Sequence, residues 1–325
     1  MSPTRTVAAL GTALLALSLT ACGSAGAADD GASSAAEGDG GTRTVESTFT
    51  GEDVEIPADP QRVVALWRTG TELAELGVVP VASLEDEFLP EELGERYDAV
   101  ADVPTVGTWE GVDIEKLIAA EPDLIIGMDN GSLGIDYEEI SQVAPTVILD
   151  IAEPTDVWAN YPTVADLVGR ATDSDERQKA LDAELAAIEE EHGDVLTGLE
   201  ATHLSTMDGI WVSTSKSLAY QRLTGAGFGY NPAYTENPER YVTELATENL
   251  PDLAGQDALF YAVNLDGSVD APTQEILDSA SWQRLPAVEA GHAFPMTSGT
   301  IYTFDAAEQQ VEDLRAAAET LAADR

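Results

Sequence analysis

Basic residues are scarce in this chain of 325 residues. It has 15 lysines and arginines against 60 aspartates and glutamates, and its formal net charge at pH 7 is −45. Proteins that bind nucleic acid or anionic lipid surfaces neutralise phosphates with clustered lysine and arginine. So few basic side chains can hardly supply such a cluster, which argues against both kinds of partner.

Cysteine and histidine are also rare. The single cysteine cannot form an internal disulfide, and three scattered histidines offer little to a bare zinc or manganese ion, which is bound by several histidines and carboxylates. Very acidic chains are often disordered, but 44% apolar residues and five tryptophans indicate a real core. The length suggests about two domains.

The first 22 residues have the pattern of a secretory signal. Arg5 precedes an apolar run over residues 7–19, which is too short to span a bilayer as a helix. The run ends in Leu19-Thr20-Ala21-Cys22, which resembles a bacterial lipobox. This resemblance predicts that residues 1–21 are removed as a signal peptide. It also predicts an extracytoplasmic protein whose membrane contact is a lipid on Cys22.

The rest of the chain divides by its pattern. Residues 22–44 are small and acidic, so we expect a flexible tether. Short apolar runs then alternate with helical stretches, for example a strand over 62–66, a helix over 71–76 capped by Thr71, and a strand over 78–82. Such runs are typical of parallel strands covered on both faces. The sequence predicts an α/β protein with lobes at 45–153 and 200–325, joined by a helical segment at 154–199.

Four stretches resemble the substrate-binding proteins of ABC importers for ferric siderophores, haem and cobalamin. They are IPADPQRVVAL at 56–66, ELAELGVVPV at 72–81, VGTWEGVDIEKLIAAEPDLIIG at 106–127 and ASWQRLPAVEAG at 280–291. The resemblance covers nearly the whole chain in the right order. It implies two Rossmann-like lobes with parallel-rich sheets, joined by a rigid long helix around a ligand cleft. It further implies a monomer that is not an enzyme, needs no cofactor, and delivers a ferric siderophore to a membrane permease.

Candidate ligand contacts follow from the rule that ligands sit outside the carboxyl ends of parallel strands. Trp67 and Arg68 follow the first strand, where a ring can cover the apolar part of a chelate and a guanidinium can pair with its oxygens. Trp109 lies in a glycine-flanked loop that the resemblance places at the cleft. In the second half the candidates are Trp211, Tyr220, Arg222 and Tyr302, with Tyr230 and Arg240 within reach. Trp211 fits a core position equally well.

The resemblance also implies that one surface glutamate on each lobe pairs with arginines of the permease. Glu115 and Glu248 occupy the matching positions, and Glu72 is a further candidate. Such rim charges set orientation and association rate. In a chain with 60 acids, an ordinary solvated glutamate is the competing interpretation.

Other functions have weaker support. The sequence lacks a Gly-x-Ser-x-Gly elbow, a phosphate loop and a His-Glu-x-x-His pair, so an α/β hydrolase-like enzyme is an unsupported alternative. A zinc- or manganese-binding lipoprotein is disfavoured by the few histidines.

A ferric siderophore needs no protein ligand, because the chelator fills the coordination sphere of the iron. Haem or cobalamin stays open, and Tyr302 could ligate haem iron. A hydroxamate chelate is favoured, because so acidic a protein repels a polyanionic catecholate.

Overall fold

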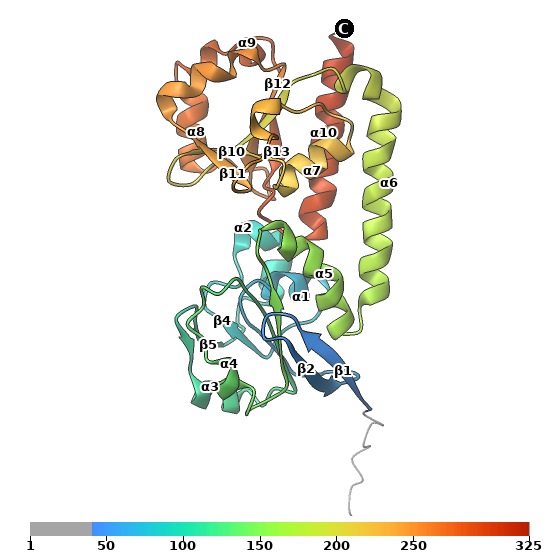
Figure 1. Cartoon of the computed structure of the whole chain (residues 1–325), viewed down its shortest axis with the longest axis vertical. Helices are drawn as coiled ribbons and strands as arrows, with labels where there is room; N and C mark the ends of the chain where they lie inside the picture. Colours follow the sequence, from blue (N-terminus) through green and yellow to red (C-terminus); the bar gives the residue numbers. More distant parts are fainter. Residues whose placement is uncertain (1–40, 325) are drawn as a thin grey trace, which may run out of the picture. The chain divides into compact units, whose positions relative to one another are not determined.

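Two β-sheets organise residues 41–324, the part of the chain that the computed structural model describes (Figure 1). Cys22, the predicted signal peptide and most of the predicted tether lie outside these residues. The first sheet has six strands, in the spatial order β6 (Gly111–Val112), β5 (Thr105–Thr108), β4 (Ala82–Leu84), β3 (Val63–Ala65), β7 (Leu124–Asp129) and β8 (Thr146–Asp150). Every neighbouring pair is parallel except β5 and β6. Strand β3 comes first in the sequence but lies inside the sheet. The later strands are added on one side of β3 and then, from β7, on the other, so the strand order reverses between β3 and β7.

An antiparallel hairpin precedes this sheet. It consists of β1 (Thr42–Ser47) and β2 (Glu52–Pro57), and Ser47 fastens it to β8: the Ser47 hydroxyl donates to the Ile148 carbonyl and accepts from the Ile148 N–H. Residues 42–44, predicted to belong to the tether, therefore belong to the folded part. The side chains of β1 alternate between exposed and partly buried, which is typical of a half-buried strand. The small and acidic composition of residues 22–44 led to the prediction of a tether instead.

Short helices connect the strands of the first lobe. Their bounds are α1 (Gly70–Glu75), α2 (Pro90–Leu93), η1 (Gly94–Ala99), α3 (Ile114–Ala119) and α4 (Tyr137–Ile140). The prediction that Thr71 caps the first helix is wrong, because the helix begins one residue earlier, behind Thr69. The strand predicted at 78–82 is β4, which begins only at Ala82. Pro80 has no N–H for a ladder hydrogen bond, which disfavours an earlier start.

The second sheet is mixed. Its order is β11 (Val242–Leu245), β10 (Ile210–Ser213), β9 (Ala201–Thr206), β12 (Ala258–Val263) and β13 (Ala293–Thr297). Strands β9, β12 and β13 are parallel, whereas β10 runs antiparallel to both β9 and β11. The expectation of parallel strands thus fails for half of this sheet. The turn of three residues between β9 and β10 is too short for a parallel crossover.

Helices α5 (Thr155–Leu167) and α6 (Ala171–Leu196) connect the two sheets. The remaining helices are α7 (Leu218–Gly225), η2 (Pro232–Tyr234), η3 (Thr247–Gly255), α8 (Ala271–Asp278), η4 (Trp282–Arg284), α9 (Pro286–Glu289) and α10 (Phe304–Ala323). The long α6 runs alongside α10 in Figure 1, and Leu185 and Ile188 of α6 share one apolar core with Leu314 of α10. Among the described residues, none of the helices combines the length and apolarity needed to span a membrane.

A buried carboxylate joins the first lobe to α10. Glu75, at the end of α1, accepts hydrogen bonds from the Tyr161 hydroxyl at 2.6 Å and from the backbone N–H groups of Phe304 and Asp305 at 2.8 and 2.7 Å. Arg177 of α6 pairs with Glu75 at 3.0 Å and with Asp305 at 2.8 Å. One side chain therefore ties together α1, α5, α6 and the start of α10.

We predict that Glu75→Leu lowers the free energy of unfolding by about 3–5 kcal/mol, because it removes the buried carboxylate partner of Arg177 and leaves the N–H groups of Phe304 and Asp305 without their acceptor. Denaturant titration measures this change. The matched control is Arg43→Gln, which removes the more exposed ion pair with Asp166 and should cost at most about 1 kcal/mol. Equal losses in the two variants would contradict the central role of Glu75.

Candidate functional site

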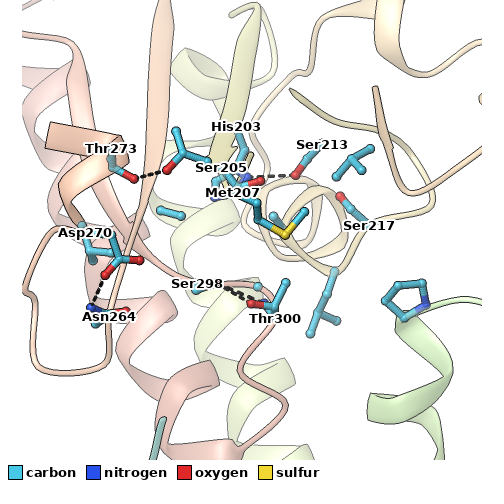
Figure 2. Close-up of a pocket in the computed structure, with 18 of the residues that line it drawn as sticks. His203, Ser205, Met207, Ser213, Ser217, Asn264, Asp270, Thr273, Ser298 and Thr300 are labelled. Carbon is cyan, nitrogen blue, oxygen red and sulfur yellow. Dashed lines mark hydrogen bonds between the residues drawn. The ribbon is translucent and has the colours of Figure 1, made fainter. Parts of the chain in front are cut away.

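Three adjoining hollows open at the carboxyl ends of strands from both sheets. One of them, lined mainly by residues of the second lobe and here called the hydroxyl hollow, has a volume of about 260 Å³. Figure 2 shows its lining, which is rich in hydroxyl groups from Ser205, Thr206, Ser213, Ser217, Thr273, Ser298 and Thr300. Part of its lining ends or follows β9, β12 and β13, as expected for a ligand site in an open α/β sheet.

The first lobe contributes the other two hollows. The acidic hollow has a volume of about 160 Å³ and is lined by Arg68, Tyr302 and four acids: Glu72, Asp86, Glu87 and Glu92. The tryptophan hollow is lined by Trp67, Trp109, Leu133 and neighbouring residues. Tyr302 and Glu92 line both the hydroxyl and the acidic hollow, and Trp67 and Glu87 line both the acidic and the tryptophan hollow. The three hollows therefore adjoin one another, and together they are called the cleft below.

Arg68 occupies the centre of this cleft in an unusual backbone conformation. Its φ is +64°, which is uncommon for a residue other than glycine and is often found at functional sites. Its guanidinium lies 5.4 Å from the ring centre of Trp67 and 5.5 Å from that of Tyr302. Within residues 41–324 the guanidinium has no ion pair, so it is free to bind an oxygen of a ligand.

Glu87 holds this conformation in place. Its two carboxylate oxygens accept the backbone N–H groups of Arg68 and Gly70, each at 3.1 Å. The approach depends on Gly70, because a Cβ at that position would lie 3.1 Å from Glu87 Oε2 and 2.9 Å from the Phe88 ring. Burial raises the pKa of Glu87 to about 7, although the two N–H groups and the charge of Arg68 oppose the shift.

Glu72 is the second buried acid beside Arg68. Its side chain is 2% exposed, and its Oε2 has no hydrogen-bond partner among the described residues. Burial raises its pKa well above the ordinary value, and the neighbouring carboxylate of Glu87 adds to the shift. Glu72 was a further candidate for permease docking. That prediction is wrong, because a side chain buried inside the cleft cannot reach a partner protein.

His203 and Tyr302 supply neutral polar groups to the hydroxyl hollow. The Nδ1 atom of His203 lies 2.9 Å from the Ser213 hydroxyl (Figure 2), and its Nε2 has no partner among the described residues. Burial lowers the pKa of His203 to about 4 and raises that of Tyr302 to about 12. At neutral pH both groups are therefore uncharged hydrogen-bonding groups.

The structure brings four of the predicted ligand contacts together in the cleft: Trp67, Arg68, Trp109 and Tyr302. Trp109 is 63% exposed at the turn between β5 and β6. Because most of this large apolar ring is exposed, it contributes little to the core. Its accessibility agrees with a role in contacting a ligand.

Three other predicted contacts do not line any of the three hollows. Trp211 is half-buried on β10, and its indole N–H donates to Asp208. Tyr220 packs edge-on against Tyr230, and the guanidinium of Arg222 is buried over the Trp158 ring at a distance of 4.5 Å. The start of α7, at Ser217 and Leu218, faces the cleft, whereas Tyr220 and Arg222 do not line it and contact Tyr230 and Trp158 instead.

The remaining candidates have different surroundings. Tyr230 supports its floor, because its hydroxyl donates to the Ser213 carbonyl and accepts from the His203 N–H. Arg240 is exposed and lies over Tyr241, which lines the hydroxyl hollow. Glu115, in the first turn of α3, and Glu248, in η3, are both exposed.

Several lining residues were missed by sequence reasoning. Ser205 and Ser298 could have been found, since both come at or after the ends of strands, where small polar residues often contact ligands. Nothing in the sequence indicated that Glu72 and Glu87 are buried in the cleft, because no local pattern separates these two acids from the 58 others. Within residues 41–324 no cluster of three or more histidine, cysteine or acidic side chains is arranged to hold a metal ion.

Comparison with known proteins gives consistent matches. The model of a family described as periplasmic binding protein matches residues 72–299. A probable siderophore-binding lipoprotein of Bacillus subtilis is 24% identical over 268 residues, which cover 78% of this chain and 79% of that protein. An iron(3+)-hydroxamate-binding protein of the same species is 26% identical over 310 residues, or 90% of each chain.

The fold also matches a solved structure, the siderophore periplasmic binding protein from the fuscachelin gene cluster of Thermobifida fusca. The TM-score is 0.72 and the identity 24%, and the match covers 81% of this chain and 98% of that one. The predicted two-lobed α/β fold is thereby confirmed.

The buried carboxyl of Glu87 gives a pH-dependent contribution to stability. Its pKa is about 7 in the folded protein and ordinarily 4.5, so the contribution is full below about pH 4.5 and is lost as the pH rises through 7. Glu72 acts in the same direction, and the charge of Arg68 opposes both. We predict that Glu87→Gln, which stays neutral, loses less unfolding free energy between about pH 5 and about pH 8 than the unaltered protein. Denaturant titrations at both pH values measure this, and equal losses would refute it.

Proposed function

Because the chain belongs to the periplasmic binding protein family, we propose that it captures a ferric siderophore in the cleft and delivers it to the permease of an ABC importer. Members of this family are solute-binding proteins, so the chain is a binding protein and not an enzyme. The observation that carries the proposal is the guanidinium of Arg68 in the acidic hollow, which has no ion pair within residues 41–324 and lies 5.4 Å and 5.5 Å from the ring centres of Trp67 and Tyr302. An aromatic pair and a guanidinium suit a chelate with an apolar shell and exposed oxygens.

The charge of the cleft favours a hydroxamate siderophore over a catecholate. Seven acidic side chains line the three hollows: Glu72, Glu85, Asp86, Glu87, Glu91, Glu92 and Asp270. Among the residues that line them, Arg68 alone is basic. Ferric hydroxamates are neutral or cationic, whereas ferric catecholates are polyanions that such a lining repels. The similarity to an iron(3+)-hydroxamate-binding protein supports the same choice.

The alternatives find less support in the cleft. The Ser213 hydroxyl contacts Nδ1 of His203, but no carboxylate among the described residues orients Nε2, so the pair lacks the third member of a hydrolytic triad. Ligation of haem iron by Tyr302 would require its phenolate, and burial raises the pKa of Tyr302 to about 12. A ferric siderophore needs neither group to ionise.

Anchoring and docking complete the proposal. Cys22, which lies outside the described residues, would carry the lipid, and the tether predicted at 22–44 would connect it to the folded part. The exposed Glu115 and Glu248 lie on different lobes and would each pair with arginines of the permease. Their exposure supports this role, because a rim charge must be solvated before docking and then orients the encounter.

We predict that ferric hydroxamates quench the intrinsic tryptophan fluorescence, because Trp67 and Trp109 would contact the iron chelate. Titration with a panel of ferric hydroxamates, ferric catecholates, haem and cobalamin measures this. In Trp109→Ala the affinity should fall about tenfold, which corresponds to about 1.4 kcal/mol. Trp211→Ala, outside the hollows, is the matched control and should bind as tightly as the unaltered protein. Quenching by no member of the panel would refute the assignment.

We further predict that Glu115→Lys combined with Glu248→Lys lowers uptake of ferric siderophore by at least about tenfold while ligand affinity is unchanged. Cells that carry each variant in place of the natural chain provide the measurement. The control is Glu190→Lys with Glu319→Lys, which changes the net charge equally at exposed sites on α6 and α10. If uptake falls equally in both, general charge rather than docking explains the effect.

A further inference from the structure

We infer that the acidic hollow takes a protonated amine on the siderophore, so that the preferred ligand is a cationic ferric hydroxamate rather than a neutral one. The inference rests on the proposed function and specifies its ligand class. It starts from the four carboxyl groups of Glu72, Asp86, Glu87 and Glu92, which line a hollow with one basic side chain. An ammonium group is the ligand group that such a lining favours.

Glu72 is the residue that points to a missing partner. Its Oε2 is buried at the hollow without a hydrogen-bond partner among the described residues. A buried polar atom in this state costs free energy, and the cost is recovered when a donor arrives. An ammonium group brings three donors and a positive charge, so it satisfies Oε2 and compensates the neighbouring acids.

The other acids of the hollow have different roles. Glu87 already has a structural one, because its carboxylate accepts the N–H groups of Arg68 and Gly70. Glu92 is half-buried and faces both the acidic and the hydroxyl hollow. Asp86 is exposed at the mouth. Glu72 therefore binds the ammonium group at the buried end of the acidic hollow. Glu92 and Asp86, which are more exposed, add negative charge nearer to the solvent.

The size and position of the hollow fit an arm rather than a whole chelate. Its volume of about 160 Å³ is several times what a single water molecule needs, and it suits a short aminoalkyl chain. It adjoins the hydroxyl hollow through Tyr302 and the tryptophan hollow through Trp67. An iron chelate held by Arg68 and the aromatic rings can thus extend an amine toward Glu72.

Binding of a cation should depend on pH in a definite direction. Burial raises the pKa of both Glu72 and Glu87, the latter to about 7, so part of the hollow is protonated at neutral pH. The charged groups that act on these carboxyls are Arg68, Glu75 and each other. An ammonium ligand favours the ionised carboxyls. Its affinity therefore rises as the pH increases through about 7, while that of a neutral ligand changes little.

The test compares two ligands that differ in one charge. Ferric Desferal, a linear trihydroxamate with a terminal amine, is titrated against the full chain alongside its N-acetylated form, with tryptophan fluorescence as the readout. The unaltered protein should bind the amine form at least about tenfold more tightly. Glu72→Gln should bring the two affinities within about threefold of each other by weakening the amine form.

Two further variants make the test decisive. Glu190→Gln removes an exposed acid of α6, outside the three hollows, and should keep the preference for the amine. Glu92→Gln should reduce the preference, and it replaces Glu72→Gln if that variant does not fold. Equal affinity of the unaltered protein for both forms would overturn the amine site while leaving the proposed function intact. Binding of neither form, nor of any other ferric siderophore, would overturn the proposed function itself.

Discussion

The carboxylate of Glu75 is the interaction on which the rest of the structure depends. By accepting the N–H groups of Phe304 and Asp305, it fixes the start of α10 against α1. Tyr302 lies only two residues before this point, and its ring lies beneath the guanidinium of Arg68. The contact between the first lobe and α10 therefore also sets the wall that the acidic and hydroxyl hollows share.

The acidity of the chain has different consequences outside and inside the cleft. Exposed carboxylates such as Glu115 and Glu248 are solvated. Their long-range negative charge attracts cationic ligands and repels anionic ones. Buried carboxyls such as Glu72 and Glu87 hold their protons more tightly, because charge is costly away from water. The same residue type thus steers ligands at the surface and recognises a particular group at the inner end of the site.

The fold class could be predicted from the sequence. So could the cleft residues Trp67, Arg68 and Trp109, which follow β3 and β5, because the end of a strand shows in the sequence as an apolar run followed by polar or aromatic residues. The sequence was insufficient where tertiary packing decides. The helical pattern predicts α7 but not which of its side chains face the cleft: Ser217, Leu218 and Ala219 line it, whereas Tyr220 and Arg222 do not. Burial of Glu72 and the antiparallel pairing of β10 depend on contacts between distant segments, which local patterns do not encode.

The central claim is that the three hollows form one site for a ferric siderophore held without a protein ligand to the iron. A crystal structure of the complex with ferric Desferal, phased to locate the anomalous signal of iron, tests this most directly. The account predicts an iron position in the cleft, flanked by Trp109, Arg68 and Tyr302, with hydroxamate oxygens as its whole coordination sphere. An iron atom outside the cleft, or one bound directly by a protein side chain, would contradict it.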